Sequence, residues 1–142
     1  MKVISRTEYF EAAHLLPGHM GKCQNLHGHS YMFKATITSE NEHEFGMILD
    51  YAYLKEAMHA VMPDHVYLHF KGNPISEDIV KVLDKYNLKY ITFENATSAE
   101  NMAPILKDIL EGYIQNELGF KDVKVVEVEL RETVNSSCIV RD

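Results

Sequence analysis

The segment His27–Ser39, which reads HGHSYMFKATITS, decides the fold of this chain. Apolar and polar residues alternate along it, and alternation with a period of two is typical of a β-strand with one buried face. The apolar face carries Tyr31, Phe33, Ala35 and Ile37. The polar stretch 41–44 predicts a turn, so we expect this strand to continue into a hairpin or meander.

Further strands are predicted on both sides of this segment. Val3–Glu11 alternates and is rich in β-branched and aromatic residues, which favours a strand. Lys121–Leu130 and Ser137–Arg141 have the pattern of two final strands, and Lys89–Phe93 that of a short one. The sheet therefore draws on both halves of the chain.

Three amphipathic segments predict helices. One follows Asp50, a plausible N-cap, and ends after Met62 because a proline comes next. Ser76–Tyr86 predicts a shorter helix.

The third helix begins at a capping-box pattern, with Thr97 as N-cap and Glu100 three residues later. It extends toward Gly119, and Pro104 beyond its first turn predicts a kink or a later start. Strands, then helices, then strands predict an α+β fold with helices covering one face of an antiparallel sheet.

Composition limits the class of protein. A length of 142 residues predicts a single domain, residues 1–142, and 46% hydrophobic with 25% charged residues is ordinary for a globular chain. The 21 acidic residues exceed the 14 basic ones and give a net charge of −7, which disfavours a nucleic-acid partner. We expect no membrane span, since no apolar run is long enough. The two distant cysteines and a start unlike a signal peptide predict a cytoplasmic protein.

Three histidines are candidates for a metal site. His27 and His29 project from the same face of a strand, and an antiparallel neighbour would bring His14 alongside them. Three neutral imidazoles suit Zn²⁺ and leave a fourth position open, as in catalytic zinc sites. The alternatives are packed or surface histidines without a metal, and a structural site in which Cys23 is the fourth ligand.

Four other residues carry chemistry that suits such a site. Cys23, four residues before His27, would have a thiol pKa lowered by a nearby dication, although most lone cysteines are simply buried. In the pair Asp64-His65, the carboxylate would orient the imidazole. Glu132 at a strand end would accept paired N–H bonds from a guanidine-like ring edge, unless it is only a solvated glutamate.

These motifs occur in an order that resembles a known family. They are Phe10-x-Ala12-Ala13-His14, Cys23-x-x-x-His27-Gly28-His29, Gly46-Met47-Ile48-Leu49-Asp50-Tyr51, Asp64-His65, Thr97-Ser98-Ala99-Glu100-Asn101 and Glu132-Thr133. Over nearly its whole length the chain resembles the 6-pyruvoyltetrahydropterin synthase superfamily, and within it the 6-carboxy-5,6,7,8-tetrahydropterin synthase branch. The three-residue gap between Cys23 and His27 favours this branch, because the pyruvoyl-forming branch of animals typically has a longer one.

The resemblance implies the tunnelling fold, a four-stranded antiparallel sheet with two helices on one face. Trimers of this fold close their sheets into a barrel, and two trimers usually stack into a homohexamer with active sites between subunits. The resemblance also implies a role for each site residue. Zinc would be held by His14, His27 and His29; Cys23 would be a base or proton shuttle, Asp64 and His65 a relay, Glu132 the pterin anchor, and Ser98 and Ala99 would lie beside the ring.

The implied activity is a zinc-dependent lyase reaction in 7-deazaguanine and queuosine biosynthesis. It converts 7,8-dihydroneopterin triphosphate to 6-carboxy-5,6,7,8-tetrahydropterin, acetaldehyde and triphosphate. The alternatives are pyruvoyl-forming elimination without carbon–carbon cleavage, another aldol-type activity on neopterin, and a non-catalytic zinc- or pterin-binding module.

The chain departs from the family pattern at the edge of the pocket. Pro63 and His69 replace a leucine and an asparagine that flank the Asp-His pair in many members, and Thr97-Ser98 replaces Pro-Thr. The segment 70–95 is longer than in compact members. These departures concern substrate detail more than zinc binding.

Overall fold

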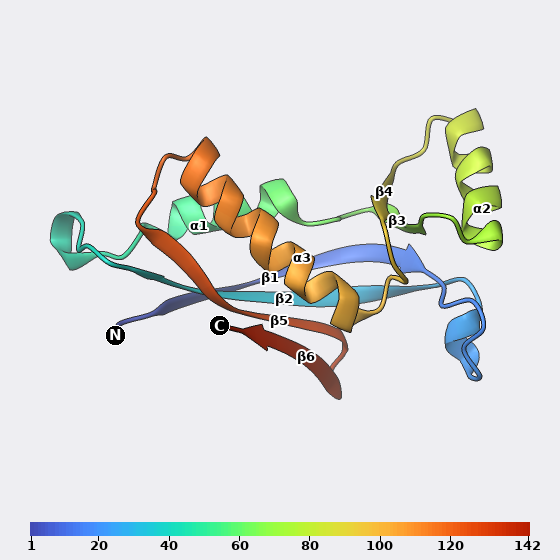
Figure 1. Cartoon of the computed structure of the whole chain (residues 1–142), viewed down its shortest axis with the longest axis horizontal. Helices are drawn as coiled ribbons and strands as arrows, with labels where there is room; N and C mark the ends of the chain where they lie inside the picture. Colours follow the sequence, from blue (N-terminus) through green and yellow to red (C-terminus); the bar gives the residue numbers. More distant parts are fainter.

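Six strands form one open sheet in the order β4-β3-β1-β2-β5-β6 (Figure 1). In this computed structural model, which describes residues 1–142, β1 (Ile4–His14) pairs antiparallel with β2 (His27–Ser39). β2 pairs antiparallel with β5 (Val123–Thr133), and β5 with β6 (Ser136–Arg141). These four strands are the predicted antiparallel sheet, and the α+β class is confirmed.

The four-stranded antiparallel sheet that the resemblance implies has two further strands here, and the short strand predicted at Lys89–Phe93 is one of them. β3 (Val66–Phe70) pairs parallel with β1 at Ala12 and Ala13 only, and parallel with β4 (Tyr90–Phe93). The sequence of β3, VYLHF, was not predicted as a strand because its three central residues are all buried. A strand covered on both faces shows no alternation, so its pattern gives no period-two signal.

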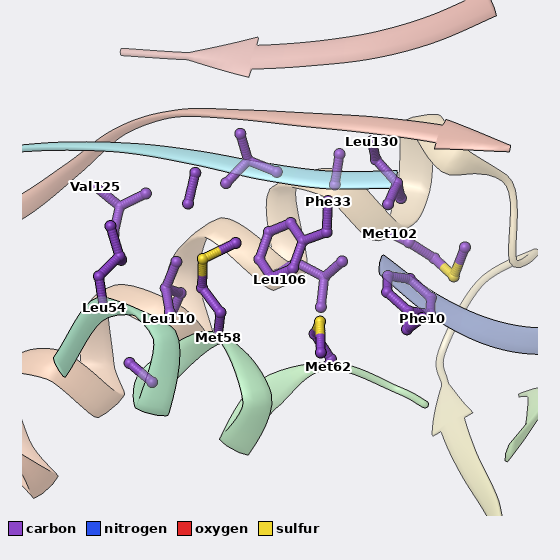
Figure 2. Packing of buried hydrophobic residues seen from close by; sticks show 14 of the residues in the cluster. Phe10, Phe33, Leu54, Met58, Met62, Met102, Leu106, Leu110, Val125 and Leu130 are labelled. Atoms are coloured by element: carbon purple, nitrogen blue, oxygen red, sulfur yellow. The ribbon is translucent and has the colours of Figure 1, made fainter. Parts of the chain in front are cut away.

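Two helices cover one face of the sheet and enclose the main core (Figures 1 and 2). α1 (Tyr51–Val61) begins at the predicted N-cap, where the Asp50 side chain accepts from the Ala52 N–H, and ends before Pro63. α3 (Ala99–Gly112) lies beside it, and a π-helical turn (Tyr113–Glu117) continues α3. Figure 2 shows the core between helices and sheet, with Phe10, Phe33, Leu54, Met58, Leu106 and Leu110 among its residues.

The N-cap of α3 is Ser98, one residue later than predicted. The Ser98 hydroxyl accepts from the Asn101 N–H at 3.3 Å, while Thr97 is buried and its carbonyl points to a histidine described below. The helix starts at Ala99 and continues through Pro104, so a later start did not occur. Either hydroxyl residue suits a cap, and tertiary contacts of Thr97 decided between them.

The remaining helix, α2 (Pro74–Lys85), packs on the opposite face of the sheet. Asn73 caps it through the Ile75 and Ser76 N–H groups, and Pro74 occupies its first turn. A small cluster of Leu15, Tyr67 and Val80, with Ala13 against it, joins α2 to this face, whereas Ala12 and Leu68 belong to the main core. The prediction that all helices cover one face is therefore wrong for α2.

Two short 3₁₀ turns lie in the connections between β1, β2 and α1. The 3₁₀ turn η1 (Lys22–Gln24) lies between β1 and β2, and η2 (Glu44–Gly46) between β2 and α1. Cys23 and Cys138 are unpaired. No helix of the structure has the length and apolar character needed to cross a membrane.

Candidate active site

The pairing of β1 with β2 brings the three candidate histidines together. His14 lies opposite His27, and Ala12 lies opposite His29, so all three imidazoles project from the face that carries Phe10. Their potential ligand atoms all lie within 4.8 Å of one another, and His27 Nε2 is 3.0 Å from His29 Nε2. The cluster lies next to the first turn of α3, because the residue before its N-cap contacts His14.

Backbone carbonyls hold two of these rings. His14 Nδ1 donates to the Thr97 carbonyl at 2.8 Å, and His27 Nδ1 donates to the Asn25 carbonyl at 2.7 Å. We assign these tautomers from the carbonyl partners, and they leave the Nε2 lone pairs available. Burial lowers the pKa of His14 to about 4, and burial also lowers the pKa of His29. Neutral imidazoles with anchored N–H groups fit a divalent transition metal.

Cys23 lies outside the group of ligand atoms. It sits in η1, half-buried and unpaired, and its carbonyl accepts from the Leu16 N–H at 2.8 Å. The alternative of a structural site with Cys23 as fourth ligand is therefore not the arrangement of this chain. Its expected role in proton transfer stays a prediction.

Glu132, near the end of β5, lies beside the histidines. Its Oε2 is 3.5 Å from His29 Nε2, and it lines a cavity of about 190 Å³ together with Ala99. Burial raises the pKa of Glu132, the charge of Glu100 raises it further, and the Ala99 N–H lowers it. Ser98 caps α3 at this side of the cavity. Its hydroxyl accepts from the Asn101 N–H, so Ser98 supports the helix start beside Glu132.

Sequence reasoning missed Glu100 as a site residue. The sequence pattern indicates only a capping-box role for Glu100. In the structure Glu100 lines the same cavity as Glu132. The signal was an acidic residue in the first turn of a helix whose start carries two other site residues, Ser98 and Ala99.

Asp64 and His65 form a pair in the loop before β3. Asp64 Oδ1 accepts from the Glu11 N–H at 2.8 Å and lies 2.9 Å from His65 Nδ1. The Glu11 N–H holds the pKa of Asp64 below its ordinary value, and the His65 ring adds to this effect. His65 adopts a φ of 56° and its side chain is 78% exposed, so the imidazole faces solvent.

The chain does not bring His65 to its own histidine cluster. His65 lines a cleft of about 580 Å³ with Glu11, Ala13 and Ser30 from one face of the sheet; the same cleft also borders Ala12, Gly28 and His29. Glu11 and Ala13 alternate with Ala12 and His14, and alternating residues of a strand project from opposite faces. The predicted relay and the predicted metal ligands therefore lie on different sides of one sheet.

Comparison with known proteins agrees with this arrangement of motifs. The family model described as 6-pyruvoyl tetrahydropterin synthase matches residues 3–142. The chain belongs to this family. Among curated relatives, the 6-carboxy-5,6,7,8-tetrahydropterin synthase of Haemophilus influenzae is 31% identical, over 95% of each chain. The enzyme of the same name from Aquifex aeolicus is 32% identical, over 82% of this chain and 74% of its own.

Solved structures with the same fold include a 6-pyruvoyl tetrahydropterin synthase and an uncharacterized protein. The enzyme of that name from Caenorhabditis elegans has a TM-score of 0.68 at 22% identity, covering 99% of this chain and 95% of its own. An uncharacterized protein from Wolinella succinogenes has a TM-score of 0.76 at 21% identity, covering 99% and 98%. At these identities the likeness supports the fold alone.

Proposed function

We propose that this protein is a zinc-dependent carbon–carbon lyase, a 6-carboxy-5,6,7,8-tetrahydropterin synthase of 7-deazaguanine and queuosine biosynthesis. Its substrate would be 7,8-dihydroneopterin triphosphate. The observation that carries the proposal is the cluster of His14, His27 and His29 beside Glu132, in a chain whose curated relatives have this enzyme name. We treat residues 1–142 as one catalytic domain, and we place it in the cytoplasm, where both unpaired cysteines stay reduced.

The three imidazoles would hold Zn²⁺, which supplies Lewis-acid stabilisation of a developing negative charge on the substrate side chain. Glu132 would accept hydrogen bonds from the N–H and amino groups of the pterin edge, in a cavity where the Ala99 N–H orients it. Ser98, as the cap of α3, would hold that N–H in place.

Two groups would move protons on opposite sides of the substrate. The Cys23 thiol would act from the loop next to the metal ligands, and His65 would act from the other side. Asp64, 2.9 Å from His65 Nδ1, would keep the opposite ring nitrogen available for the transfer.

The proposed reaction balances without an external oxidant or reductant. Triphosphate leaves and one water is consumed. A carbon–carbon bond within the substrate side chain breaks, which releases acetaldehyde and leaves one side-chain carbon on the ring. The dihydropterin ring gains two hydrogens while the retained side-chain carbon becomes a carboxylate. The oxidation and the reduction therefore occur within one molecule.

The site would be completed by a second subunit. Because His65 and the histidine cluster lie on different faces of the sheet, the relay of one chain would serve the metal site of a neighbour. Outer strand edges are available for such an assembly: β6 at one side, and residues 4–10 of β1 at the other, because β3 pairs with β1 only at Ala12 and Ala13 and the loop before β3 bonds Glu11. We propose a trimer closed into a barrel, or a dimer of trimers.

Product identification tests the proposal. The zinc-loaded protein is incubated with 7,8-dihydroneopterin triphosphate, and the products are analysed by mass spectrometry and an aldehyde trap. We expect 6-carboxytetrahydropterin and acetaldehyde in equal amounts. Formation of 6-pyruvoyltetrahydropterin without acetaldehyde would assign the chain to the pyruvoyl-forming reaction instead, and absence of any turnover would contradict catalysis.

A further inference from the structure

Helix α2 has an apolar surface wider than the sheet covers. Its buried side is formed by Ser76 and Val80. Ile75, Val82 and Tyr86 lie at spacings of seven and four residues, which places them on one face of a helix. These side chains are 54%, 55% and 62% exposed. The exposed face is called the α2 strip below.

The helix that carries this strip is firmly attached. The Ser76 hydroxyl is 2.8 Å from the Tyr67 hydroxyl and accepts from the Phe70 N–H at 2.9 Å. Buried His69 on β3 lies 2.7 Å from Glu77 of α2. Exposure of the strip is therefore a property of a fixed helix and does not come from loose packing.

The strip borders the cleft into which His65 opens. Leu83, on the side of α2 between the strip and the buried face, lines this cleft, and so does Leu88, which is 56% exposed. The apolar surface thus continues from the wall of the cleft onto α2.

A second exposed apolar surface lies beside the metal ligands. The loop between His14 and His27, which contains Cys23, carries Met20 with 99% and Leu26 with 60% of its surface exposed. Both side chains lie within one seven-residue stretch of this loop, where a contact with another chain would cover them. This loop and the α2 strip belong to the two separate halves of the proposed active site.

We propose that the α2 strip packs against the Cys23 loop of a second copy of this chain. The proposal rests on the proposed function, because it places the metal site of one chain in the His65 cleft of the next. Two different surfaces then meet, so the interface is heterologous and every chain uses its strip and its loop once in a closed ring. The insertion 70–95 would thereby link assembly to completion of the site.

Two single substitutions test the interface from its two sides. Val82→Asp places a carboxylate in the strip, and Met20→Asp places one in the loop. A carboxylate buried against apolar side chains without a partner is strongly unfavourable, so each change should raise the dissociation constant of the assembly at least about tenfold. The matched control is Lys81→Asp, which introduces the same group one residue away at a position with a 79% exposed side chain.

The readout is the mass of each protein by analytical ultracentrifugation over a range of concentrations, with circular dichroism to verify folding. We expect single chains for Val82→Asp and for Met20→Asp at concentrations where the wild type and Lys81→Asp stay assembled. An equal mixture of the two variants should form a two-chain species, because the intact loop of one meets the intact strip of the other.

Assembly of both variants like the wild type would overturn the proposal, and so would a mixture that remains single-chain. Should Val82→Asp not fold, Met20→Asp in the loop between β1 and β2, at a side chain that is 99% exposed, gives the same decision. Mass does not depend on turnover. Failure of the proposed function would appear separately, as an assembled wild type that releases no acetaldehyde.

Discussion

The backbone around Thr97 serves the metal cluster and a helix at the same time. The Thr97 carbonyl accepts from His14 Nδ1, and the next residue, Ser98, caps α3. Because one short segment carries both interactions, the orientation of the buried imidazole depends on where the helix begins. The same helix start presents the Ala99 N–H to Glu132. A few consecutive residues therefore join the proposed metal ligands to Glu132, the proposed pterin anchor.

Removal of one imidazole should remove the metal. We expect His27→Ala to reduce zinc from about one equivalent per chain to a small fraction, since two remaining imidazoles do not complete a zinc site. Inductively coupled plasma mass spectrometry after dialysis measures the ratio. His59→Ala is the control, because His59 is half-exposed and pairs with Glu8 away from the cluster. Unchanged stoichiometry in His27→Ala would disprove the ligand assignment.

Removal of the thiol should leave the metal and abolish turnover. We expect Cys23→Ala to bind zinc like the wild type while kcat falls at least about 10²-fold, the usual size of a general acid–base contribution. Gln24→Ala, an exposed neighbour in the same 3₁₀ turn, is the control. Full activity of Cys23→Ala would exclude the thiol from the mechanism.

Most elements could be predicted from the sequence because their residues alternate or repeat visibly. The strand Val66–Phe70 could not, since burial on both faces removes the alternation. The cap of α3 was misplaced by one residue because Thr97 and Ser98 suit the position equally, and only the contact of Thr97 with His14 separates them. The side of the sheet that α2 covers depends on long-range packing, which a local pattern does not contain.

Pro104 should weaken α3. It lies six positions into a helix that continues past it, has no N–H to donate, and is exposed. We expect Pro104→Ala to raise the free energy of unfolding by about 2 kcal/mol, as the restored helix outweighs the larger entropy of the unfolded chain. Urea denaturation of the zinc-loaded proteins measures the difference. A decrease in stability would mean that the proline ring makes packing contacts worth more than the missing bond.

Glu77 should make the attachment of α2 sensitive to acid. The Gly72 N–H, and then His69, hold the pKa of Glu77 below its ordinary value of 4.5. A carboxyl whose pKa is lowered by folding binds protons more readily when unfolded, so its stabilising effect is present above about pH 4.5 and is lost as pH falls through its folded pKa. We expect Glu77→Gln to be less stable than the wild type at pH 7, and the difference to shrink as the pH falls below 4.5 through the lowered pKa of Glu77. Equal stability at all pH values in urea titrations would contradict the prediction.

At the scale of the whole molecule, the sequence predicts which residues belong to the site but not how they meet. The motif order contains His14, His27, His29, Asp64 and His65, yet the structure places the last two on the other side of the sheet. Adjacency of motifs along a family pattern carries no information on which copy of the chain supplies each one. The two halves of the proposed site can be told apart only in the folded sheet. There Glu11 and Ala13 project from the face opposite to Ala12 and His14.

Chains with complementary defects should restore each other. His27→Ala retains the relay and His65→Ala retains the metal site, so both alone should be inactive. Random pairing of equal amounts leaves about a quarter of all interfaces with both halves intact, and every mixed three-membered ring has one intact interface out of three. We therefore expect between about a quarter and about a third of wild-type activity in the doubly purified sample. Differently tagged chains purified through both tags provide the sample. Inactive mixed assemblies would show that each chain uses its own His65.

In the proposed ring, the shape of the open sheet would also determine how many chains assemble. Chains joined edge to edge through two different surfaces turn by a constant angle at each step, and only an angle that divides the full circle gives a closed ring; any other angle gives a growing filament. The irregular register between Thr36 and Ile37, where β2 meets β5, changes the local twist and hence this angle. In the proposed assembly, this single backbone irregularity in the middle of the sheet would therefore help to separate a closed ring from a fibre.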